Sequence, residues 1–261
     1  MSDEKKTEDL AEGTLMSHLL ELRNRLMKAM LGLLICFIPC AIYANDLFTL
    51  IAQPLLEKLP EGTSLIATSV VSPFMTPFKV AFYVGLFIAM PVVLYQIWAF
   101  VAPGLYRREK HFAVPLLVSS VFLFYAGAVF AYFAVFPVMF SYLVGTAPTG
   151  VSYMPDMASY LDFVLTLFFA FGIAFEMPVA VVLLVLTGLV KVDTLGKNRG
   201  YVIIGIFVVA AFLTPPDAIS QTIMAVPMYL LYEGGLAMAR LMQKMRRDAA
   251  AATEKEEAKA S

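Results

Sequence analysis

Long stretches without a charged residue limit most strongly how this chain can fold. Residues 112–155 contain no Asp, Glu, Lys or Arg, and the same holds for 29–45 and 80–106. A helix of about 20 residues crosses the roughly 30 Å hydrocarbon core of a bilayer. The longest stretch therefore holds one span and a connection, and the Gly, Pro and Thr residues of 145–156 place the connection at its end.

The composition agrees with a membrane protein. Of the 261 residues, 60% are apolar and 15% are charged, whereas soluble domains have roughly 45–50% and about 25%. A soluble fold of this length could not bury so much apolar surface, because a single core stops growing near this size. Lipid removes that restriction.

We therefore predict an all-α, polytopic membrane protein with six transmembrane helices. They are expected near residues 29–45, 80–106, 115–143, 161–190, 200–213 and 219–232. The last two are short, since fourteen residues at 1.5 Å each reach only about 21 Å. A re-entrant hairpin and two short true spans that thin the bilayer locally both remain open.

Positive charge sets the expected orientation. Seventeen of the 19 Lys and Arg residues fall before span 1, between spans 2 and 3, between spans 4 and 5, or after span 6. Only Lys58 and Lys79 fall on the other side. The positive-inside rule then places both termini in the cytoplasm.

Three regions follow from these spans. Residues 1–28 form a cytoplasmic segment, which lacks the features of a cleaved signal peptide. It contains an amphipathic surface helix with apolar residues at helical spacing, Leu15, Leu19, Leu22 and Leu26. Residues 29–233 form the membrane domain, with an outer cap at 46–79 that is broken by prolines. Residues 234–261 form a cytoplasmic tail, either a frayed helix or disordered.

The sequence contains no recognisable catalytic machinery. The two histidines, His18 and His111, lie in charged inside segments, and no metalloprotease, serine-protease or phosphate-loop motif occurs. Cys36 and Cys40 lie four residues apart in an apolar run, which favours two buried thiols over a metal site. We predict no enzyme activity, no metal, no cofactor and no nucleic-acid partner.

One acid lies within a predicted span. Glu176 is costly at membrane depth, so it needs a partner or a water-filled cavity. It either hydrogen-bonds internally and pins two helices, or forms a docking point for a partner's helix or a proton-sensitive site. Thr214 and Gln221 add polar groups to the short hairpin, where they pack against each other or bond an incoming helix.

Two further acids, Glu21 and Glu109, lie in predicted cytoplasmic segments. Carboxylates suit the capture of guanidinium groups, whose planar fork pairs with them through two hydrogen bonds. The alternative is that each neutralises a neighbouring arginine of the chain, since exposed ion pairs are common and weak.

Five segments carry a family resemblance. They are SHLLELRNRL (17–26), IATSVVSPFMTPFK (66–79), LYQIWAFVAPGLYRREK (94–110), FGIAFEMPVAVVLL (171–184) and LTPPDAISQTIMAVPMYLLYE (213–233). Together they closely resemble the TatC family, the multi-spanning receptor subunits of bacterial twin-arginine protein translocases. The resemblance covers about residues 14–240 in order. It departs at Gly104, where some relatives have Ala, and at Ala211, where some have a larger apolar residue.

The resemblance implies roles by position. The residues matching the site for the two arginines of a signal peptide are Glu21, Arg23, Phe100 and Glu109. Those matching the surface where the single-span subunits TatB and TatA dock are Glu176, Thr214 and Gln221. Those matching the outer cap and its Pro-Pro-Asp turn are Pro54, Ser72, Pro73 and Asp217.

The expected function is that of a receptor in the bacterial inner membrane. It would bind twin-arginine signal peptides of folded proteins, assemble with TatB, TatA and other copies of itself, and use the proton gradient. The alternatives are an ion-coupled small-solute transporter using Glu176, an intramembrane enzyme, and a scaffold that recognises no signal. The absence of an inverted repeat counts against the transporter.

Overall fold

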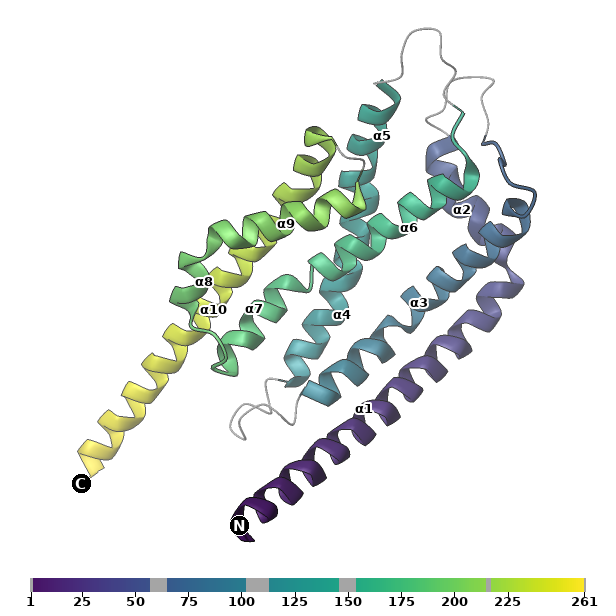
Figure 1. Cartoon of the computed structure of the whole chain (residues 1–261). Helices are drawn as coiled ribbons and strands as arrows, with labels where there is room; N and C mark the ends of the chain where they lie inside the picture. The colour runs from purple at the N-terminus through teal and green to yellow at the C-terminus, as the bar shows by residue number, and fades with distance from the viewer. Residues whose placement is uncertain (1, 57–64, 102–112, 146–153, 215–216, 261) are drawn as a thin grey trace. The chain divides into compact units, whose positions relative to one another are not determined.

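The computed structural model describes residues 2–56, 65–101, 113–145, 154–214 and 217–260, and it is helical almost throughout (Figure 1). Within those ranges the only strand-like pairing is an isolated bridge between Ile66 and Asp156. The prediction of an all-α protein is confirmed. The helices are α1 (Ser2–Ile42), α2 (Ala44–Leu56), α3 (Ser72–Val101), α4 (Ala113–Phe130), α5 (Phe136–Gly145), α6 (Met157–Ala174), α7 (Met177–Leu186), α8 (Val192–Lys197), α9 (Arg199–Leu213) and α10 (Ala218–Ala260).

Five helical segments are long and apolar enough to cross a membrane. They have 24 to 32 residues and run over Leu19–Ile42, Ser72–Phe100, Val114–Gly145, Met157–Leu186 and Ala218–Met245. The third joins α4 to α5 through a π-helical turn, Ala131–Val135. A sixth apolar helix, α9, has only 15 residues, or about 22 Å at 1.5 Å per residue. These segments match the predicted spans in order.

The chain divides into two compact units, of which the first contains α1, α2, α3, the beginning of α4 and residues 154–161. Helix α1 packs along α3 (Figure 1). Small buried side chains, Cys40, Ala44 and Ala81, lie at the packed outer end. Cys36 and Cys40 are free thiols. The predicted role of Cys40 as a small buried apolar residue is confirmed.

Helix α1 is continuous through residue 28, where we expected a surface helix to meet the first span. The residues of the amphipathic pattern therefore form an extension of the spanning helix. Only 6% of the Leu19–Ile42 segment is buried within the protein. Water would make so much exposed apolar surface costly, so lipid must cover it.

The outer connection differs in detail from the predicted cap of 46–79. Helix α2 occupies Ala44–Leu56, and α3 begins at Ser72, so residues 72–79 are the first two turns of a span. In residues 65–71, the described part of the connection between α2 and α3, Thr68 is held by Asp156. Its Oδ1 accepts the Thr68 N–H (3.1 Å) and hydroxyl (2.8 Å), and its Oδ2 accepts those of Ser159 (3.0 and 2.9 Å).

The second unit contains α4 from Val118, α5, α6 from Asp162, and α7 to α10. Its core is a cluster of buried aliphatic and aromatic side chains from α6, α9, α10 and the π-helical turn, among them Phe171, Ala210 and Met224. Gly127 of α4 lies directly against α6. A Cβ at that position would lie 2.4 Å from the Phe171 carbonyl oxygen, so only glycine allows this approach.

The last helix is not short, and this part of the prediction is wrong. Helix α10 has 43 residues and continues through Gly234 and Gly235 to Ala260. Glycine weakens a helix by about 1 kcal/mol, but packing outweighs that cost here, since Gly235 is buried against Pro178 of α7. The residues predicted as a frayed helix or a disordered tail therefore continue the helix of the last span.

Candidate functional site

The fourth span is broken at Glu176. Helix α6 ends at Ala174, Phe175 and Glu176 form a turn, and α7 begins at Met177. Pro178 has no N–H to donate and its ring crowds the preceding turn, which favours a break one turn before it. The sequence placed Glu176 in mid-span but did not predict the break, although Pro178 is its signal.

The turn aims the Glu176 side chain at α4. The Ser120 hydroxyl of α4 donates a short hydrogen bond to Glu176 Oε2. The other oxygen, Oε1, is buried and has no hydrogen-bond partner within the described residues. An acceptor left without a donor in a buried place is costly. The site is therefore ready to accept a donor from outside the chain.

Thr214 and Gln221 lie on either side of the turn between α9 and α10. Thr214 is buried, and its hydroxyl donates to the Ala210 carbonyl 2.9 Å away. Gln221 is half-buried in the first turn of α10. The structure therefore assigns the Thr214 hydroxyl to its own helix, which leaves Gln221 as the more available of the two groups.

Asp217 caps α10. Its Oδ1 accepts the N–H groups of Ser220 (2.8 Å) and Ile219 (3.1 Å), the usual arrangement at a helix N-terminus. These bonds, that from Ser220 foremost, favour the ionised form and lower the pKa of Asp217. The acid of the Pro-Pro-Asp turn thus begins the last helix.

Glu21 lies on α1 and already binds a guanidinium. Arg25, one turn further on, donates from Nε (2.9 Å) and Nη2 (2.5 Å) to Glu21 Oε1. The Glu21 side chain is 36% exposed. Arg23 is exposed and Phe100 is half-buried. Glu109 lies outside the described residues, so the predicted pairing of Glu21 with Glu109 stays a prediction.

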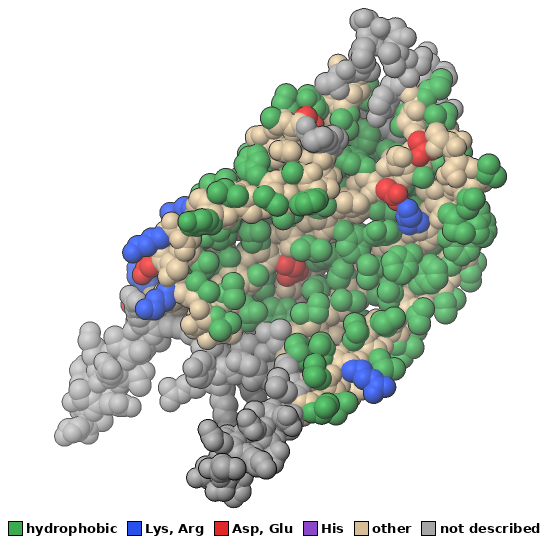
Figure 2. Space-filling model, viewed as in Figure 1, with side chains coloured by type: hydrophobic (Ala, Val, Ile, Leu, Met, Phe, Trp, Pro, Cys, Tyr) green, Lys and Arg blue, Asp and Glu red, His purple; other side chains and the backbone are tan. Residues whose placement is uncertain are grey.

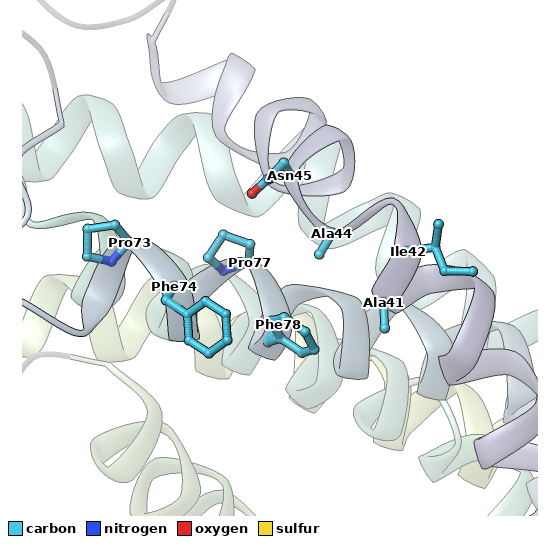
Figure 3. Close-up of a pocket in the computed structure, with 8 residues that line it drawn as sticks. All are labelled: Ala41, Ile42, Ala44, Asn45, Pro73, Phe74, Pro77 and Phe78. Carbon is cyan, nitrogen blue, oxygen red and sulfur yellow. The ribbon is translucent and has the colours of Figure 1, made fainter.

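The end of α1 and the beginnings of α2 and α3 line a cavity of about 390 Å³ (Figure 3). Pro73, Phe74, Pro77 and Phe78 line it from α3, and Asn45 lines it from α2. Ser72 is buried at the start of α3. Pro54 belongs to α2, and its side chain is outside the described part. Of the predicted cap residues, Ser72 and Pro73 thus lie together at the start of α3 in the first unit.

Sequence reasoning missed several partners. Ser120 was not expected to bond Glu176, and Asp156 was not singled out. A third group lies where α9 meets α10, and there Arg199 binds both oxygens of Glu233 while the Tyr229 hydroxyl donates to Glu233 Oε1 at 2.9 Å. No sequence spacing links residues 34 apart. The only hint in the sequence was the free-energy cost of placing an acid such as Glu233 beside an apolar span, which implies a partner for it.

The described residues contain no group of three or more His, Cys, Asp or Glu side chains able to hold a metal. The surface in view is mostly hydrophobic, and its charges are scattered except over α8, where Lys and Arg gather (Figure 2). Isolated carboxylates beside apolar helices suit the binding of cationic or hydrogen-bonding segments.

These features define a class, the polytopic α-helical membrane proteins that bind through polar groups set in apolar helices. The family model of the Sec-independent protein translocase protein (TatC) matches residues 17–227. The chain belongs to the TatC family.

Related proteins and a solved structure agree with this family assignment. A TatC from Azotobacter chroococcum mcd 1 is 54% identical over 222 residues, covering 85% of this chain and 87% of the relative. The TatC of Escherichia coli (strain K12) is 51% identical over 226 residues, covering 87% and 88%. The crystal structure of a twin arginine translocase receptor, TatC, has a TM-score of 0.77 at 39% identity and covers 86% of this chain and 98% of its own.

Proposed function

We propose that this chain is the receptor subunit of a twin-arginine translocase, which binds the signal peptides of folded proteins at the cytoplasmic end of α1. Membership of the TatC family supports the translocase role. The observation that carries the recognition step is the Glu21 carboxylate, partly exposed and already bound to a guanidinium. A peptide arginine needs the same contacts that Arg25 makes.

Exchange of one guanidinium for another costs little. The Glu21–Arg25 pair links residues one helical turn apart at a partly exposed site, and such pairs contribute about 0.3–0.5 kcal/mol. An incoming arginine displaces Arg25 from Oε1 or joins it on the second oxygen. Glu109 would receive the second arginine of the signal, with Arg23 and Phe100 beside the site.

The apolar part of the signal would then insert along the helices, where single-span partners assemble. Glu176 supports this step because its Oε1 is a buried acceptor to which no side chain or backbone group of the described residues donates. A polar group on a partner helix would satisfy it, for about 0.6–2 kcal/mol of net stabilisation. Gln221 is the second contact. The partners are TatB, TatA and further copies of this chain.

Orientation follows from positive charge, with both termini in the cytoplasm. The chain performs no catalysis itself, and the energy comes from the proton gradient, because the sequence has no nucleotide-binding motif. Family membership favours this function over an ion-coupled solute transporter based on Glu176.

Charge reversal tests the recognition step. The full chain with Glu21→Lys and Glu109→Lys should insert normally but lose binding of a labelled twin-arginine peptide and export of its cargo. The control, Asp46→Lys, makes one such acid-to-lysine change at an exposed residue in the first turn of α2. Normal export by the double variant would refute the proposal.

A further inference from the structure

Basic residues lie around α8, at the start of α9 and on the part of α10 beside them. We define them as the basic cluster, which contains Lys191, Lys197, Arg199, Arg240 and Lys244. Two acids, Asp193 and Glu233, lie among these five bases. Only Glu233 has a partner among them, Arg199. Positive charge is therefore in excess, and Figure 2 shows Lys and Arg side chains gathered over α8.

Two guanidinium groups of this cluster meet at Gly196 of α8. Arg199 Nη1 donates to the Gly196 carbonyl oxygen, 3.3 Å away. Arg240 Nη2 comes so close that a Cβ on Gly196 would lie 2.9 Å from it. The Tyr232 hydroxyl fixes α8 to α10 by donating to the Leu195 carbonyl at 2.8 Å. Arginines from two helices are thus held beside one backbone position.

An apolar groove leads away from this cluster. It is a cavity of about 170 Å³ between α9 and α10, lined by Ile203, Ile206, Phe207, Ala225, Val226, Tyr229 and Leu230. Ile203 and Phe207 follow Arg199 at intervals of four residues, so they continue the face of α9 that begins with the arginine. At the same end, Tyr229 bonds Glu233. The groove is therefore lined by apolar side chains and reaches charged side chains at one end.

We propose that this groove and the basic cluster form a binding site for an anionic phospholipid, with an acyl chain in the groove and the phosphate against Arg240, Arg199 and Lys197. Charge complementarity selects the occupant, because lipid phosphate is the abundant anion at the boundary of a bilayer. Helix α9 strengthens the case, since its length of about 22 Å draws headgroups toward its ends.

The proposed site uses none of the residues proposed for signal recognition, so it stands or falls independently of that function. Bound there, the lipid would cover the groove and neutralise the excess charge. A partner helix with an acidic residue presents different chemistry at the same place, because its anion carries no acyl chain. The experiment below distinguishes the lipid from an anion that has no acyl chain.

The test uses the full chain, purified in detergent, with lipid binding measured by native mass spectrometry. Dioleoyl phosphatidylglycerol should bind at least about fivefold tighter than dioleoyl phosphatidylcholine, which has the same acyl chains. Arg240→Gln and Lys197→Gln should each weaken phosphatidylglycerol binding about fivefold, and the double variant about 25-fold. Val226→Trp, which fills the groove from an exposed position, should weaken both lipids.

Lys28→Gln on α1 is the matched control and should change neither affinity. Equal binding of the two lipids would overturn the proposal, as would a loss in Lys28→Gln equal to that in Arg240→Gln. Displacement by inorganic phosphate at the same concentration would show a free-anion site, and unchanged binding in Val226→Trp would exclude the groove. Either result would also overturn it.

Discussion

Glu21 and Glu176 are carboxylates beside apolar helices, yet the chain surrounds them differently. Glu21 lies on an exposed face of α1 and holds Arg25 through one oxygen. Glu176 lies at the break between α6 and α7, with a hydroxyl on one oxygen and, in the part of the chain that the structure describes, no donor on the other. The first environment suits exchange of cations at a boundary, and the second suits capture of a neutral donor within the membrane.

The largest effect should come from Glu21→Lys. We expect at least 30-fold weaker binding of a twin-arginine peptide, corresponding to about 2 kcal/mol, because a lysine at this position places a like charge against the peptide arginines, which costs several kcal/mol. Peptide titration of the chain in detergent measures it. Glu176→Gln should leave this affinity unchanged. An equal loss of peptide affinity in both variants would contradict the difference proposed between the two sites.

Ser120→Ala should lower the free energy of unfolding by about 1–2 kcal/mol, because Glu176 loses the donor on Oε2. Thermal unfolding in detergent measures this change. Ser119→Ala, one residue away on α4, is the control. In a background of Glu176→Leu the Ser120→Ala cost should fall below about 0.5 kcal/mol, and a cost that persisted there would mean that Ser120 acts through other contacts.

Glu176→Leu together with Ser120→Ala should raise the free energy of unfolding by about 1 kcal/mol while export fails. Replacing both partners of a buried hydrogen bond by apolar groups of similar size is often neutral or stabilising. Thermal unfolding measures the change in stability, and an export assay on the same variant measures the loss of export. A loss of more than about 2 kcal/mol would instead favour the internal pin that the sequence left open.

Arg25→Gln should strengthen peptide binding about twofold, because it removes the arginine that competes for Glu21. The pair contributes only about 0.3–0.5 kcal/mol, so the unfolding free energy should fall by no more than that. Titration with the same peptide measures the gain. Weaker binding in this variant would mean that Arg25 positions Glu21 and does not compete with the peptide.

The smallest effect concerns Asp156, outside the spans. Four donors, the backbone N–H of Ser159 foremost, lower the pKa of its carboxyl. An acid with a lowered folded pKa stabilises the fold above its unfolded pKa, near 3.9, and loses that contribution as the pH falls further. Thermal unfolding should therefore show no Asp156-dependent change between pH 8 and 5. Below pH 4 the stability of the fold should decline, and Asp156→Asn should remove that decline.

The spans could be predicted because they depend on apolar length alone, and all six expected segments correspond to helices. The length of α10 could not, since Gly234 and Gly235 resemble a helix end and only the packing of Gly235 against Pro178 reveals otherwise. Glu176 was identified because an acid has a high free-energy cost in lipid. A neighbouring arginine, here Arg25, was the alternative partner expected for Glu21. The Ser120 and Arg199–Glu233 contacts depend on distant helices meeting, which no local pattern encodes.

The most direct test of signal recognition at α1 is photo-crosslinking from Leu22, which is exposed beside Glu21 and leaves that carboxylate intact. With the full chain in membranes, a twin-arginine peptide should crosslink to this position, and a twin-lysine peptide should do so much less, because lysine lacks the planar fork. The exposed Leu189 serves as the reference position. Equal crosslinking of both peptides from Leu22, or crosslinking from Leu189 alone, would contradict recognition by Glu21.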